Sequence, residues 1–220
     1  GSTSKLDSPE SPPPKPMRLA AGDVRIWNYV LVEGGLALVG MALAWAAGFG
    51  ALARPSGAEE LIWAGPIAWG VGSGLAFFGI MTLLEQAPWE PIDHLRELVE
   101  EALGRLLRDV SLLQVAALSL AAGVGEEVLF RGFLQQGIAD ALGRQEFSPL
   151  VAQTAAIGVT SLVFGLCHAI SKLYLVAAGA TGALLGWLYL ATDSLLAPIA
   201  AHAVYDFAVI LLFLRSRRAT

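Results

Sequence analysis

Six long apolar segments constrain the fold of this chain more than any other feature. A helix needs about 20 mostly apolar residues to cross the roughly 30 Å hydrocarbon core of a bilayer. Segments that meet this requirement are residues 26–52, 61–84, 110–142, 150–170, 173–192 and 195–214. The sequence therefore predicts an all-α, polytopic transmembrane helical bundle with about six spans.

The composition also indicates a membrane protein. Only 15% of the 220 residues are charged and 55% are hydrophobic, whereas a soluble domain has about 25% charged residues. The net charge of −5 and the lack of a basic stripe outside the tails argue against binding to nucleic acid. The single cysteine, Cys167, excludes an intrachain disulfide and a multi-cysteine zinc site.

Two segments differ from the apolar ones. Residues 1–23 are rich in Pro and Ser without an apolar run, which predicts a disordered tail and not a signal peptide. Residues 24–220 are predicted to form a single transmembrane helical domain. Within it, residues 91–109 have one apolar and one charged helical face. They predict either an amphipathic interfacial helix that gates a site or a soluble connecting helix.

The basic residues predict the orientation of the spans, because cytoplasmic loops are enriched in Lys and Arg. With a cytoplasmic N-terminus, only Arg54 and Arg144 fall outside. Eleven fall inside, namely Lys5, Lys15, Arg18, Arg25, Arg96, Arg105, Arg108, Lys172, Arg215, Arg217 and Arg218. We therefore predict that both termini are cytoplasmic. The compact, Ala-, Gly- and Leu-rich chain indicates a bacterial inner membrane.

Ionisable side chains inside the predicted spans indicate a functional site, because a charge in the bilayer is costly. The ionisable residues there are Glu33, Glu126, Glu127, Arg131, His168, His202 and Asp206. Glu127 and Arg131 are four residues apart and are expected to form an ion pair on one helical face. Glu126 points elsewhere without such a partner, which suits a carboxylate that takes up and returns a proton. The alternative is a structural polar contact between helices.

Two histidines lie on other spans. His168 shares a helical face with Phe164, and His202 is four residues before Asp206, whose carboxylate can orient or charge the imidazole. A carboxylate and two histidines can activate water, protonate a leaving amine and stabilise an oxyanion. On straight helices, however, His168 falls near the inner end of its span and His202 in the outer half. A shared site therefore requires tilted, kinked or shorter spans.

The ordered motifs E-E-x-x-x-R, F-x-x-x-H and H-x-x-x-D resemble those of the Abi family, which contains CAAX prenyl endopeptidases and bacteriocin-processing proteins. The motif-bearing core is residues 111–214. The resemblance implies an intramembrane glutamate protease in which Glu126 activates water, while Glu127 and Arg131 organise the site. It further implies that His168 helps to hold the water and that His202 stabilises the oxyanion.

The resemblance has one departure, because Asp206 stands where the CAAX endopeptidases have asparagine. An ionised aspartate cannot donate a hydrogen bond to an oxyanion, so Asp206 would instead keep His202 cationic. Glu33 has no implied role, and we expect it to pair with Arg131 or to lie near the membrane interface.

Several alternatives remain open from the sequence. Glu and His are also zinc ligands, although no H-E-x-x-H motif is present, and we expect hydrolysis without a cofactor. Buried Glu, His and Asp also occur in proton-coupled transporters. A third alternative is a non-catalytic membrane partner such as a bacteriocin self-immunity protein. As a peptidase, the protein would act on a peptide or on the tail of a membrane protein. The sequence does not indicate its oligomeric state.

Overall fold

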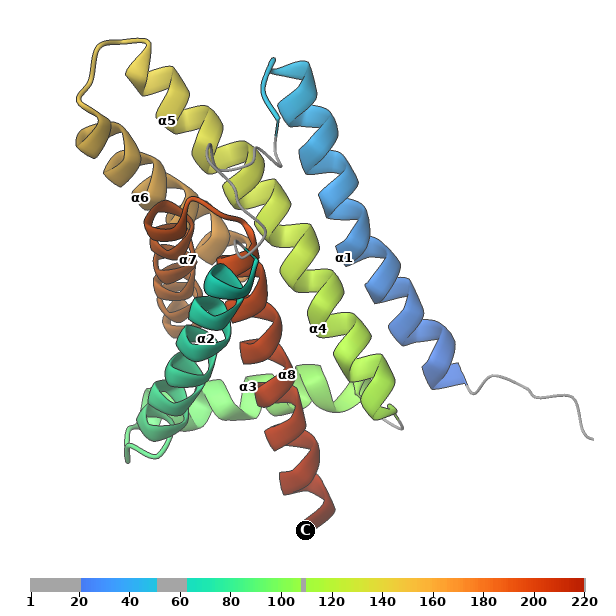
Figure 1. Cartoon of the computed structure of the whole chain (residues 1–220). Helices are drawn as coiled ribbons and strands as arrows, with labels where there is room; N and C mark the ends of the chain where they lie inside the picture. Colours follow the sequence, from blue (N-terminus) through green and yellow to red (C-terminus); the bar gives the residue numbers. More distant parts are fainter. Residues whose placement is uncertain (1–20, 51–62, 108–109, 220) are drawn as a thin grey trace, which may run out of the picture.

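The chain folds into a helical bundle in a computed structural model that describes residues 21–50, 63–107 and 110–219 (Figure 1). The elements are α1 (Ala21–Ala46), α2 (Ala64–Leu84), α3 (Glu90–Leu106), α4 (Leu112–Glu127), the π-helix η1 (Val128–Gln135), α5 (Gln136–Gly143), α6 (Pro149–Cys167), α7 (Lys172–Thr192) and α8 (Leu196–Ala219). No strand occurs in these residues. The predicted all-α fold is confirmed.

The six predicted spans are also confirmed. The described residues contain six helical segments long and apolar enough to cross a membrane: Arg25–Ala46, Ala64–Leu84, Leu112–Gly143, Pro149–Cys167, Lys172–Thr192 and Leu196–Ser216. The third consists of α4, η1 and α5 in one helix of 32 residues, which runs diagonally across the bundle in Figure 1. It is the central span, because 56% of its apolar window is buried, against 33% or less elsewhere.

The predicted tail is only partly covered. Residues 1–20 lie outside the described residues, and α1 begins at Ala21. Residues 21–23 therefore belong to the helix and not to the tail. No proline lies between Pro16 and the apolar run, so the first turn of α1 is free of the residue that most disfavours a helix.

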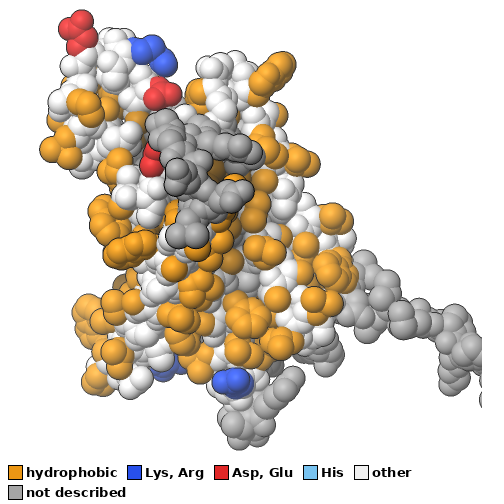
Figure 2. All heavy atoms as spheres, viewed as in Figure 1, with side chains coloured by type: hydrophobic (Ala, Val, Ile, Leu, Met, Phe, Trp, Pro, Cys, Tyr) orange, Lys and Arg blue, Asp and Glu red, His pale blue; other side chains and the backbone are white. Residues whose placement is uncertain are grey.

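The helices form neighbouring pairs around the central span. α1 lies against α4 and η1, α6 against α7, and α2 against α8, while α8 also contacts α4. Figure 2 shows that apolar side chains cover the middle of one face of the bundle, with charged side chains at its two ends. Lipid is the solvent that such a surface requires.

Serine residues fix the beginnings of three spans. Ser111 Oγ accepts a hydrogen bond from the Gln114 backbone N–H (3.2 Å), and Gln114 Oε1 accepts one from the Ser111 N–H (2.8 Å). Ser148 and Ser171 accept equivalent bonds at the starts of α6 and α7. Each such cap stabilises a helix by about 1 kcal/mol. The Ser171 cap begins α7 only a few residues after α6 ends, which keeps the intervening segment short.

The predicted amphipathic helix is α3, Glu90–Leu106. It lies across the end of the bundle near the C-terminus, roughly perpendicular to the spans (Figure 1), and contacts both α1 and α7. Arg96 Nη2 donates a hydrogen bond to the Glu85 carbonyl oxygen (2.6 Å), and Arg96 Nη1 donates one to Asp93 Oδ1 (2.8 Å). The bond to Glu85 holds α3 against the end of α2, in the orientation expected of an interfacial helix.

Glycines allow α2 to approach α8 closely, which gives a first testable prediction. A Cβ atom added at Gly74 would lie 2.5 Å from the Ala201 carbonyl oxygen, whereas one at Gly72 would meet open space. We expect Gly74→Ala to lower the free energy of unfolding by about 1–3 kcal/mol and Gly72→Ala to change it by less than about 0.5 kcal/mol. Unfolding of both variants in detergent measures this difference, and equal effects would contradict the close contact between α2 and α8 at Gly74.

Candidate active site

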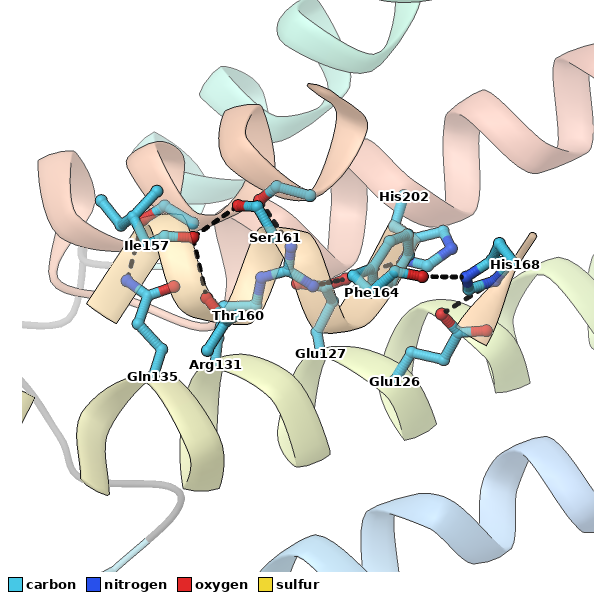
Figure 3. Close-up of polar contacts among 12 residues, drawn as sticks. Glu126, Glu127, Arg131, Gln135, Ile157, Thr160, Ser161, Phe164, His168 and His202 are labelled. Atoms are coloured by element: carbon cyan, nitrogen blue, oxygen red, sulfur yellow. Dashed lines mark hydrogen bonds and ion pairs between the residues drawn. The ribbon is translucent and has the colours of Figure 1, made fainter. Parts of the chain in front are cut away.

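All six predicted site residues come together in the middle of the bundle (Figure 3), from the end of α4, η1, the end of α6 and the first half of α8. The contacts that join them are Glu126–His168 (3.7 Å), Glu127–Arg131 (2.9 Å), Glu127–His202 (2.8 Å) and His202–Asp206 (3.5 Å). The contact between Glu127 and His202 joins side chains that are 75 positions apart in the sequence.

Glu127 is the buried centre of these contacts. Its Oε1 lies 2.9 Å from Arg131 Nη1 and 2.8 Å from His202 Nδ1. The side chains of Glu127 and Arg131 are fully buried, and Arg131 Nη2 donates a 2.7 Å hydrogen bond to the Gly182 carbonyl oxygen. The ion pair expected from the spacing of Glu127 and Arg131 is therefore present. Together these bonds tie the central span to α7 and α8.

Glu126 points away from this centre, toward His168 at the end of α6 (Figure 3). His168 Nδ1 lies 2.8 Å from the Phe164 carbonyl oxygen. Because a carbonyl oxygen only accepts, Nδ1 carries the hydrogen, and Nε2 of the neutral ring presents its lone pair toward Glu126. The distance of 3.7 Å between Nε2 and Glu126 Oε2 is too long for a direct hydrogen bond.

His202 lies between two carboxylates. Its Nδ1 faces Glu127, and its Nε2 lies 3.5 Å from Asp206 Oδ2. Only a protonated imidazole has a hydrogen for each of these neighbours. The side chains of Asp206 and His168 are 31% and 30% exposed, whereas that of Glu127 is fully buried. His202 Nε2 and Glu126 thus face the more open side of the site.

The two histidines lie close together, although straight helices were expected to place them at different depths. The ring of Phe164 stacks on His168 with centroids 4.4 Å apart and contacts His202 edge-on at 6.1 Å. The central span contains wide π-helical turns directly after Glu127, and such turns are frequent at functional sites. Pro198 lies in the first turn of α8, where it begins the helix and does not kink it.

Two groups that join the central span to α7, the Gly182 carbonyl and the side chain of Gln135, were not predicted from the sequence. The Gly182 carbonyl is a backbone group, and no side-chain pattern reveals it. Gln135 is fully buried and donates a hydrogen bond to the Gly186 carbonyl oxygen (3.1 Å). A glutamine in an apolar span is a sequence signal that could have indicated this contact. Glu33 was expected to contact Arg131 or to lie near the interface. No contact between Glu33 and Arg131 occurs in the described residues, and Glu33 is within electrostatic reach of His202, Asp206 and His168; its depth in the membrane stays a prediction.

The comparisons with known proteins agree with this arrangement. Residues 108–208 match the family model described as type II CAAX prenyl endopeptidase Rce1-like. The matched region contains all six predicted site residues and nearly the whole of the motif-bearing core. No match to the chain was found among curated proteins or among solved structures. Residues 108–208, somewhat less than half of the chain, are therefore similar to the Rce1-like type II CAAX prenyl endopeptidases, and this likeness together with the six apolar helices indicates an integral membrane protein of the peptidase type.

Proposed function

We propose that this membrane peptidase hydrolyses peptide bonds in or near the membrane with a water molecule activated by Glu126. One observation carries the proposal. Glu126 Oε2 is buried, has no hydrogen-bond partner among the described residues, and lies 3.7 Å from His168 Nε2. A carboxylate and an imidazole nitrogen that both accept hydrogen bonds can hold the two hydrogens of one water molecule.

The proposed reaction needs one proton to move twice. Glu126 takes a proton from water as the water oxygen bonds to the peptide carbonyl carbon. The carbonyl oxygen becomes anionic in the tetrahedral intermediate. Glu126 then returns the proton to the nitrogen as the C–N bond breaks, which releases a carboxylic acid and an amine. His168 accepts the second hydrogen of the water and so directs its lone pair at the substrate.

His202 is proposed to stabilise the oxyanion. A protonated imidazole donates Nδ1–H to Glu127, so its Nε2–H and its positive charge are available on the open side of the site. Asp206 beside Nε2 supports this role by favouring the cation, since an ionised aspartate has no hydrogen to donate. Glu127 and Arg131 are positioning residues that hold the ring.

We further propose that the reaction needs no metal ion. Among the described residues, no three His, Cys, Asp or Glu side chains are grouped to hold one. We expect cleavage of a library of membrane-proximal peptides by the detergent-solubilised protein, read by mass spectrometry, to be unchanged by a strong chelator. Loss of cleavage with chelator and its recovery with zinc would contradict the metal-free mechanism. Gradient-dependent ion transport without cleavage would favour the transporter alternative.

The orientation and the substrate are proposals as well. The start of α1, the end of α8 and helix α3 lie at the same end of the bundle (Figure 1). Arg25, Arg96 and Arg215 belong to these elements, whereas Arg144 follows α5 at the opposite end. This distribution supports cytoplasmic termini, as expected for a bacterial inner membrane. The proposed substrate is a peptide or the tail of a membrane protein, which α3 would admit between α1 and α7.

A further inference from the structure

Glu33 on α1 lies beside the site although it belongs to none of the three motifs. α1 and α4 touch where Gly125, the residue before Glu126, meets the backbone of Glu33. A Cβ atom added at Gly125 would overlap the Glu33 carbonyl group. This close approach places Glu33 next to the part of α4 that carries Glu126. Glu33 therefore borders the site from a helix outside the matched family region.

Glu33 is within electrostatic reach of the site, and no hydrogen bond or ion pair joins it to the described residues there. It interacts electrostatically with His202, Asp206 and His168, and also with Glu126. Its Oε2 is buried, and no described residue provides a hydrogen bond to that oxygen. The neighbouring cationic groups are already engaged, because Arg131 bonds to Glu127, and both imidazoles face other carboxylates.

The charges of the site do not balance. Four carboxyl groups, those of Glu33, Glu126, Glu127 and Asp206, face only three groups that can be cationic, those of Arg131, His168 and His202. When all four carboxyl groups are ionised, one negative charge stays unmatched even with both imidazoles protonated. Glu126, of which 9% is exposed, also directs a buried Oε2 without a partner into the site. A carboxyl group in a membrane interior marks a functional site, and a cation that arrives with a ligand would match its charge.

We propose that Glu33 determines specificity by binding a cationic side chain, Lys or Arg, close to the scissile bond of the substrate. This inference rests on the proposed peptidase function. The ligand's ammonium or guanidinium group would supply the missing positive charge beside Glu126 and His202. An ion pair of this kind discriminates strongly when it is partly withdrawn from water. Peptides without a cation at that position would leave Glu33 unmatched and would be cleaved more slowly.

The experiment compares peptides that differ by one charge. Each position flanking an observed cleavage site carries either lysine or the neutral norleucine, and kcat/KM is measured for both peptides. We expect wild type to prefer lysine at one position by roughly tenfold. Glu33→Gln should reduce this preference, measured as the ratio of kcat/KM for the two peptides, to near unity. Glu33→Asp, which keeps the charge, should retain part of the preference.

The matched control is Glu97→Gln, which removes the same charge from the exposed surface of α3 and should keep the full preference. Equal cleavage of both peptides by wild type, or a preference that survives in Glu33→Gln, would overturn the role of Glu33 in specificity but not the proposed peptidase function. An equal loss of activity toward both peptides in Glu33→Gln would show a structural role and would also overturn it. If wild type cleaves no peptide at all, both the proposed peptidase function and this inference fail.

Discussion

Glu126→Gln is expected to abolish peptide cleavage, with a loss of at least the roughly 10²–10⁴-fold that a general base contributes. The amide has nearly the same shape as the carboxylate but cannot take a proton from water. Cleavage of the membrane-proximal peptide library by the purified variant, compared with wild type under identical conditions, measures the loss. Glu97→Gln, at an exposed position of α3, is the control that should cleave like wild type.

The stability of Glu126→Gln separates a catalytic from a structural role. Glu126 Oε2 has no hydrogen-bond partner among the described residues, so the carboxylate is buried without full compensation, which costs stability. We therefore expect the variant to unfold in detergent at the same temperature as wild type or at a higher one. A variant that still cleaves peptides would sink the mechanism, and a variant that unfolds much more easily would indicate a structural polar contact instead.

Contacts within one helix could be predicted from the sequence. The i,i+4 spacing placed Glu127 beside Arg131 and His202 beside Asp206, and both pairs are present at 2.9 Å and 3.5 Å. Helical periodicity alone determines which side chains share a face, so no knowledge of the other helices was needed. The six spans could also be predicted from the sequence, because the thickness of the hydrocarbon core sets the length of a spanning helix.

Contacts between helices could not be predicted in this way. Whether Glu127 meets His202, or Glu126 meets His168, depends on the tilt and rotation of three helices, which packing determines. Straight helices placed the two histidines at different depths, and the π-helix that follows Glu127 had no recognisable signal in the sequence. The combined chemistry of a carboxylate and two histidines, together with the family resemblance, indicated that the motifs share a site. Glu33 lies outside those motifs, so only the structure shows that it borders them.

Arg131→Leu is expected to cause the largest loss of stability, about 3–5 kcal/mol, because it breaks a fully buried ion pair by removing one partner. Glu127 would lose its guanidinium partner and keep only His202, and the Gly182 carbonyl oxygen would lose the 2.7 Å hydrogen bond that joins η1 to α7. Unfolding of the variant in detergent measures the loss. Arg144→Leu, at the exposed turn after α5, should have little effect.

A second substitution tests whether the loss arises from the uncompensated charge. Glu127→Gln in the Arg131→Leu background removes the carboxylate that has lost its guanidinium partner, while the amide oxygen can still accept a hydrogen bond from His202 Nδ1. Replacing both members of a buried pair is much less costly than removing one, so the double variant should be more stable than Arg131→Leu alone. The two single variants and the double variant form a thermodynamic cycle. Strictly additive effects in that cycle would mean that Glu127 and Arg131 do not stabilise each other, and that the cost of Arg131→Leu comes from the lost bond to Gly182 and from the cavity.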